Sequence, residues 1–157
     1  MTPEQRQREH LTYLITGDLT AAADLREQFA DHSRTSAAEH VRAAAAVCLE
    51  FRFGPGAGRG AGAIDRDELA AFMSEIRQSN HDIKPSLDLL AVEAAVRSLY
   101  GEPHLVESPG IDVFGDAFAS AFYTALRHQV RAHPWLAANP GYVVDRARQL
   151  MMFWLLG

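Results

Sequence analysis

"DVFGDAFASAFYTALRHQVRA", residues 112–132, carries the clearest helical pattern in the chain. Five large apolar residues recur there at every fourth position: Phe114, Phe118, Phe122, Leu126 and Val130. Because residues three and four positions apart share one face of a helix, this spacing predicts a long amphipathic helix with a buried face. His133 and Pro134 follow and predict its end, since the residue before a proline disfavours the helical conformation.

Helix-start signals divide the rest of the chain into similar segments. Thr2 before Pro3 predicts the start of a first helix, because a side-chain oxygen can cap it and proline suits its first turn. Residues 36–39 and 65–68 each have the spacing of a capping box. The predicted helices cover residues 3–16, 20–31, 36–53, 66–79, 86–100 and 112–132, with one turn at 134–138 and a last helix from 140. The sequence therefore predicts an all-α bundle of six or seven helices, forming a single domain over residues 1–157.

The stretch "GPGAGRGAGA", residues 54–63, has the strongest outward likeness to a motif. Residues 58–63 fit only a relaxed dinucleotide fingerprint, and they follow a predicted helix where that fingerprint needs a strand. The acidic residues at 65–68 would also repel a phosphate from the start of the next helix. A phosphate-binding loop of the P-loop type needs a lysine, and the stretch has none.

The same stretch resembles the second half of an EF-hand calcium loop. Counted from Ala57, Gly62 occupies the sixth position and Glu68 the twelfth, as that loop requires. The first, third and fifth positions supply no carboxylate, and the third is Arg59. We therefore expect no calcium binding, and we predict that residues 54–63 form a flexible connector between two helices.

Composition limits the classes of partner. The net charge of −5 argues against nucleic acid, because phosphate contacts need a surplus of Lys and Arg on one face. The first ten residues are polar and charged, and the longest apolar run, Leu150–Leu156, is far shorter than a membrane-spanning helix. We expect a cytoplasmic protein that contacts neither nucleic acid nor membranes. Arginine outnumbers lysine fourteen to one, which is typical of a GC-rich bacterial genome.

The seven histidines include no H-x-x-x-H pair. If the first and third predicted helices pack together, His10 and His40 would meet, with Glu9 and Glu39 completing a bridging metal site. Ordinary exposed or half-buried histidines are the simpler interpretation, so we predict no metal and no cofactor.

Catalytic signatures are also missing. The chain contains no G-x-S-x-G, C-x-x-C or H-E-x-x-H sequence. Cys48 is the only cysteine, and it falls in an apolar helical stripe, which is typical of a buried small side chain. The sequence thus favours a protein that is not an enzyme.

Eight of the fourteen aromatic residues lie after Ile111, and this clustering leaves three interpretations open. The cluster is a core, a dimer seam, or an aromatic-lined ligand pocket between the C-terminal helices. The residues expected to line such a pocket are Phe118, Phe122, Trp135 and Tyr142.

The last predicted helix is apolar on every side over residues 150–156. Such a helix needs cover all round, which a second copy of the chain would supply. Trp154 is expected to face its own domain, while Met152 and Phe153 face the partner. The sequence thus favours a non-enzymatic interaction or regulatory module that acts as a homodimer and contacts another protein or a small apolar ligand. The alternative is a small-molecule binding domain with an aromatic pocket.

Overall fold

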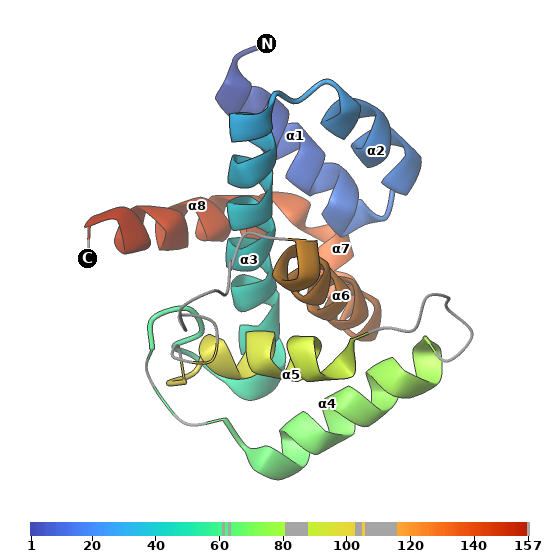
Figure 1. Cartoon of the computed structure of the whole chain (residues 1–157), viewed down its shortest axis with the longest axis vertical. Helices are drawn as coiled ribbons and strands as arrows, with labels where there is room; N and C mark the ends of the chain where they lie inside the picture. The colour runs from blue at the N-terminus through green and yellow to red at the C-terminus, as the bar shows by residue number, and fades with distance from the viewer. Residues whose placement is uncertain (61, 63, 81–87, 103–104, 106–115, 157) are drawn as a thin grey trace.

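The computed structural model describes residues 1–60, 62, 64–80, 88–102, 105 and 116–156. Within these ranges the chain forms eight helices and no strand, and the predicted all-α bundle is confirmed (Figure 1). The helices are α1 Pro3–Thr16, α2 Leu19–Glu27, α3 Asp31–Phe53, α4 Arg66–Ser79, α5 Leu89–Ser98, α6 Asp116–Ala132, α7 Pro134–Ala138 and α8 Pro140–Leu156. None of the helices in the described ranges has the length and hydrophobicity that a membrane-spanning segment requires.

The long helix α3 is the centre of the bundle. It packs most extensively against α6 and α8, and α1 lies along its N-terminal half (Figure 1). From Ala43 to Leu49 every residue of α3 is buried, because neighbours surround the helix there. The predicted stripe of α6 supplies part of that cover, since Phe122, Leu126 and Val130 are all buried. Phe114 lies outside the described residues.

Helix starts agree with the predicted caps at some positions and not at others. Thr2 caps α1 and forms a capping box with Gln5. Of the box predicted at residues 65–68 the structure shows one half, because the Asp65 side chain accepts a hydrogen bond from the Glu68 amide while the Glu68 carboxylate binds Arg52. The predicted box at Ser36 is wrong, because α3 begins five residues earlier, at Asp31. Contacts with α1 stabilise this early start: Gln7 donates a hydrogen bond to the Ser33 carbonyl at 2.7 Å.

The glycine-rich stretch after α3 makes specific contacts with the body of the bundle. Ala57 is 2 % exposed, and the Gly58 amide donates a hydrogen bond to the Leu99 carbonyl at 2.8 Å. The Trp154 indole donates to the Gly58 carbonyl from α8. Gly58 has φ +76°, and a Cβ there would lie 2.8 Å from the Leu150 side chain. The stretch therefore packs against the end of α8 and also connects α3 to α4.

Helix α4 lies on the outside of the bundle beside α5, and an ion-pair network fastens it to α3 and α6 (Figure 1). Arg52 of α3 binds both carboxylate oxygens of Glu75, at 2.8 and 2.5 Å, and also contacts Glu68 at 2.9 Å. His128 of α6 contacts Glu75 at 3.0 Å. The hydrogen bonds from Arg52, and then from His128, lower the pKa of Glu75 to about 2. The charges at this end of α3 are therefore mutually paired.

Candidate functional site

The four aromatic residues expected to line a pocket are divided between the core and the surface. Phe122 is 1 % exposed in the core, and Phe118, one turn earlier, is partly buried against it. Trp135 and Tyr142 lie at the surface, and their ring centroids are 5.2 Å apart. Among these four, ring contacts join only Trp135 and Tyr142. Sequence reasoning missed the third ring of this surface cluster, Phe51, because it lies far away in the sequence.

The alternative of a bridging site at His10 and His40 required α1 and α3 to pack together. Helices α1 and α3 do pack together, and the two imidazoles are close enough for their charges to interact. Glu9 instead accepts a hydrogen bond from the Tyr13 hydroxyl at 2.6 Å, and His40 Nδ1 lies 2.7 Å from the Ser36 carbonyl oxygen. Nowhere in the described ranges do three or more His, Cys, Asp or Glu side chains gather as metal ligands.

Cys48 is fully buried in α3, as its place in the apolar stripe predicts. Burial raises the pKa of its thiol to about 12, because the thiolate would be desolvated. A thiol held in that form is a poor nucleophile at neutral pH.

A cleft of about 390 Å³ opens between α1, α2, α3 and α6. Helix α1 lies beside the N-terminal half of α3, α2 packs on α1, and α6 runs past the middle of α3 (Figure 1). The first described turns of α6 contribute Ala119, Ser120 and Tyr123 to the cleft. The volume falls in the range of roughly 300–1,000 Å³ that is common for small-molecule sites. We refer to this space as the α1–α2–α6 cleft.

The walls of the α1–α2–α6 cleft are mainly apolar and formed by small side chains. Leu14, Leu19 and Val41 supply the larger apolar surfaces, and five alanines from α2, α3 and α6 supply the rest. The methyl groups of these alanines are too small to fill the space between the helices. The open space thus follows directly from residue size.

His10 places a polar ring in this apolar surrounding. The residue is 3 % exposed, and it makes no hydrogen bond to any other residue in the described ranges. Its ring meets the Phe29 ring edge-on, with centroids 5.4 Å apart. Burial, followed by the nearby Arg26 and His40 charges, lowers the pKa of His10 to about 4. The imidazole is therefore neutral at pH 7, with one nitrogen able to donate and one able to accept.

Arg26 is the charged residue of the cleft. It lies on α2 with an exposed side chain, and its charge reaches His10. The lining residues include no Asp or Glu. A buried neutral imidazole and an exposed guanidinium therefore line one apolar space.

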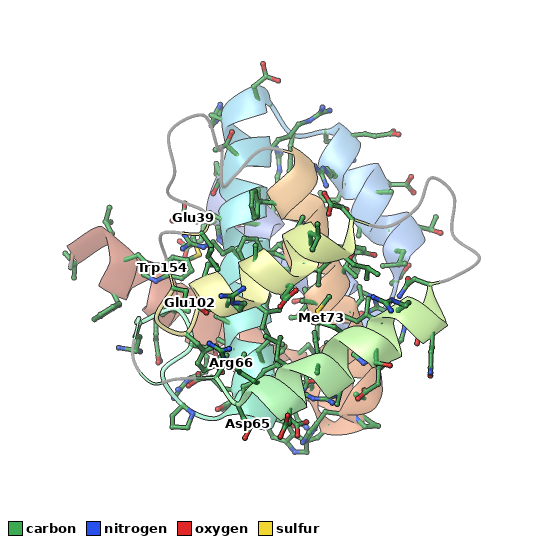
Figure 2. The ribbon with its side chains drawn as sticks, turned by 60° about the horizontal axis from the view of Figure 1, so that its bottom comes forward. Glu39, Asp65, Arg66, Met73, Glu102 and Trp154 are labelled. Atoms are coloured by element: carbon green, nitrogen blue, oxygen red, sulfur yellow. The ribbon has the colours of Figure 1, made fainter. Side chains whose placement is uncertain are left out.

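A second hollow, of about 380 Å³, lies between α4 and α5 and differs in its chemistry. Figure 2 shows Met73 between these helices, with Arg66 and Glu102 at the end where α4 begins and α5 ends. Arg97 binds both carboxylate oxygens of Glu102, at 2.8 and 2.6 Å. The charged groups that line this second hollow are exposed or paired with one another. The α1–α2–α6 cleft differs, because the His10 ring that lines it has no hydrogen bond in the described ranges.

A third and smaller hollow, of about 250 Å³, lies beside the surface aromatic cluster. Phe51 and Tyr142 line it, together with Glu50 and Arg146. The Glu50 carboxylate already accepts a hydrogen bond from the Gly56 amide at 2.9 Å.

The residues expected at a dimer seam lie near the exposed end of α8. Met152 is 49 % exposed and Phe153 is 43 % exposed, while Leu155 and Leu156 are each 81 % exposed. Phe153 is partly covered within the chain, because the Arg59 guanidinium lies 4.6 Å from its ring centroid. Trp154 turns toward its own chain, as expected (Figure 2). Whether a second copy covers this end stays a prediction.

Sequence reasoning did not find the α1–α2–α6 cleft. The signal was present in part, since His10 and Leu14 lie one turn apart on one face of the first helix. What the sequence did not show was that the alanines of α2, α3 and α6 would face the same space. Comparison of the chain with models of known protein families, with curated proteins and with solved structures finds no match.

Proposed function

We propose that this protein is a small-molecule binding domain whose site is the α1–α2–α6 cleft. The observation that carries the proposal is His10, a buried imidazole without a hydrogen bond in the described ranges, at the wall of an apolar space of about 390 Å³. The ring polar atoms remain accessible from the cleft, where they can bond to water or to a ligand. A bound molecule can therefore hydrogen-bond to the ring in place of water.

Ala38 offers a direct test of the site. It is half-buried on α3 and lines the cleft, so Ala38→Phe would fill the space from one wall. We expect octan-1-ol, a neutral apolar probe, to shift the amide NMR signals of α1, α2 and the first turns of α6. The Ala38→Phe variant should abolish these shifts. The control is Ala71→Phe at an exposed position of α4, which should leave them intact.

Native mass spectrometry of the purified protein complements this titration, because it detects a compound that remains bound through purification. Two results together would overturn the proposal. They are a mass equal to that of the bare chain and no octan-1-ol shifts at the cleft.

We also propose that the protein pairs with a second copy through the end of α8, a surface separate from the cleft. Residues 149–156 carry no charge, whereas the chain as a whole has a net charge of −5. The ends of the two helices therefore bring no like charges of their own together, although the Arg59 guanidinium lies beside Phe153 at the edge of the seam. Burying the four exposed apolar side chains there would stabilise the pair by roughly 1–2 kcal/mol each, since only part of each is accessible.

Light scattering at tens of micromolar protein tests the pairing. The wild type should have the mass of a dimer, and a Met152→Glu, Phe153→Glu double variant should have the mass of one chain. A wild type with the mass of one chain would refute the pairing. A double variant that stays dimeric would place the seam elsewhere.

A further inference from the structure

We propose that the ligand of the α1–α2–α6 cleft is a small amphipathic acid, whose carboxylate binds at Arg26 and His10 and whose apolar part lies against the alanine walls. This inference rests on the proposed function, and it adds the charge and the orientation of the ligand.

The first argument is the charge of the cleft relative to the charge of the chain. The chain has twenty acidic residues and fifteen basic ones, so its net charge disfavours an anion. The cleft lining has one arginine and no carboxylate. An Arg guanidinium also suits a carboxylate geometrically, because it presents parallel N–H donors to both oxygens.

The second argument is the state of His10. Burial holds its ring neutral, so one ring nitrogen carries a hydrogen that can be donated to a ligand oxygen. A carboxylate has enough lone pairs to accept from this ring and from Arg26 together. A cationic ligand would instead face Arg26 at close range, and a purely apolar ligand would leave both polar groups without a partner.

The third argument concerns the size of the occupant. The space is bounded by four helices and holds about 390 Å³, which suits a small molecule rather than a segment of another chain. Leu14, Leu19 and Val41 would contact the apolar part of the ligand. The chemistry that fits is therefore one acidic group on a compact apolar body.

Three probes with the same octyl tail separate the contribution of charge from that of apolar burial. They are octanoate, octan-1-ol and octylamine, titrated at pH 7 and followed by the amide NMR signals of the cleft. We expect octanoate to bind about tenfold more tightly than octan-1-ol, since a charge-assisted hydrogen bond is worth roughly this factor. Octylamine should bind most weakly of the three.

The Arg26→Gln variant tests the assigned partner of the carboxylate. It should lose about tenfold in octanoate affinity and leave octan-1-ol affinity within about twofold. The matched control is Arg34→Gln, an exposed arginine of α3 outside the cleft, which should not change the binding of any probe.

Proton uptake supplies a readout that a purely structural role of Arg26 would not move. A bound carboxylate raises the pKa of His10, opposing the effects of Arg26 on α2 and His40 on α3, with the phenol of Tyr123 on α6 facing the same cleft. Calorimetry at pH 6 in two buffers with different ionisation enthalpies should show protons taken up with octanoate and none with octan-1-ol. The His10→Leu variant should abolish the uptake.

The outcomes separate this inference from the function on which it rests. If octan-1-ol shifts the cleft signals and octanoate binds no more tightly, the cleft is a binding site and the anionic ligand is wrong. If Arg26→Gln weakens both probes equally, the assigned role of Arg26 is wrong. If no probe shifts the cleft signals and no bound compound is found by mass, both proposals fail.

Discussion

The two ends of α3 meet their neighbours in opposite ways. Near its N-terminus, small side chains such as Ala37 and Ala38 face α1, α2 and α6, and a cleft remains. At its C-terminus, Arg52 and Phe53 fill the space against α4 with ring contacts and ion pairs. The same helix thus supports a filled, fully paired junction at one end and an open, partly unpaired one at the other.

This difference shows how side-chain size and polar pairing together distinguish a structural junction from a binding site. At the filled end the partly buried guanidinium of Arg52 has two carboxylates as partners. At the open end the buried imidazole of His10 has none in the described ranges. Polar groups that the chain itself satisfies hold a fold together, whereas one left without a partner in an apolar space is available to a ligand.

The largest expected effect on stability comes from truncating a side chain that packs at the C-terminal, filled end of α3. Phe72 of α4 is fully buried and meets the rings of Phe53 and His128, with centroids 5.4 and 5.1 Å away. Phe72→Ala should lower the free energy of unfolding by about 3–5 kcal/mol, the usual cost of truncating a buried phenylalanine. Urea denaturation measures the change. An unaltered midpoint would show that α4 does not pack as described.

The next largest effect is the pH dependence of stability that His10 causes at the N-terminal, open end of α3. The pKa of His10 is lowered from 6.5 to about 4, so the unfolded chain binds more protons than the folded one between these values. Stability should therefore fall as pH decreases from 6.5 toward 4, by about 2–3 kcal/mol from this residue alone.

The His10→Leu variant removes this contribution, so its stability should depend less on pH than that of the wild type between pH 7 and pH 4.5. Urea titrations at both pH values give the comparison. The control is His32→Leu, an exposed histidine of α3. Equal changes in both variants would contradict a role for burial at His10.

A smaller effect is expected from breaking the ion-pair network at the filled end. Glu75→Gln removes the carboxylate that binds Arg52 and His128. The Glu75 side chain is 42 % exposed, so solvent screening reduces the expected cost to about 1 kcal/mol at pH 7. Glu68→Gln, which removes a single contact to Arg52, should cost less.

The pH dependence of this loss of stability tests whether it comes from the charge of Glu75. Its pKa is lowered from 4.5 to about 2, so its contribution is present above pH 4.5 and is lost as pH falls toward 2. The stability difference between wild type and Glu75→Gln should therefore shrink below pH 4.5. A constant difference would mean that the effect comes from packing and not from charge.

The smallest effect is expected from a larger side chain at the open end. Ala38→Leu places three carbons in the cleft, and stability should stay within about 1 kcal/mol of wild type. The matched variant is Ala45→Leu, on the fully packed middle of the same helix, where overpacking typically costs about 1–3 kcal/mol. Equal losses at both positions would show that the cleft cannot accept added volume.

The helices were largely predictable because their signals are local. The α6 stripe, the Thr2 cap and the Asp65 cap depend on residues within a few positions of one another. The structure confirms both caps and the burial of Phe122, Leu126 and Val130 in the stripe. The box at Ser36 failed because contacts from α1 extend α3 past a good local cap, and such tertiary contacts override propensity. Phe118, expected at the centre of a buried face, is only partly buried, whereas Phe122 is fully buried.

The cleft was not predictable, because it depends on which faces of four helices meet. His10 was noted in the sequence only as a possible metal ligand with His40. Its position beside Arg26 depends on the packing of α2 against α1, which no local pattern specifies. Ring contacts such as that between Phe51 and Tyr142 also require the tertiary arrangement of α3 and α8.

The glycine-rich stretch has a consequence for the way this chain would vary among relatives. Its glycines at 54, 56, 58, 60 and 62 all have φ between 68° and 100°, a region that other residues rarely adopt. Selection would therefore keep glycine at every second position. An alignment would then display a repeated glycine signature easily mistaken for a nucleotide-binding motif. The cause of this signature would be the positive φ angles of a loop that packs against Leu150 and Trp154.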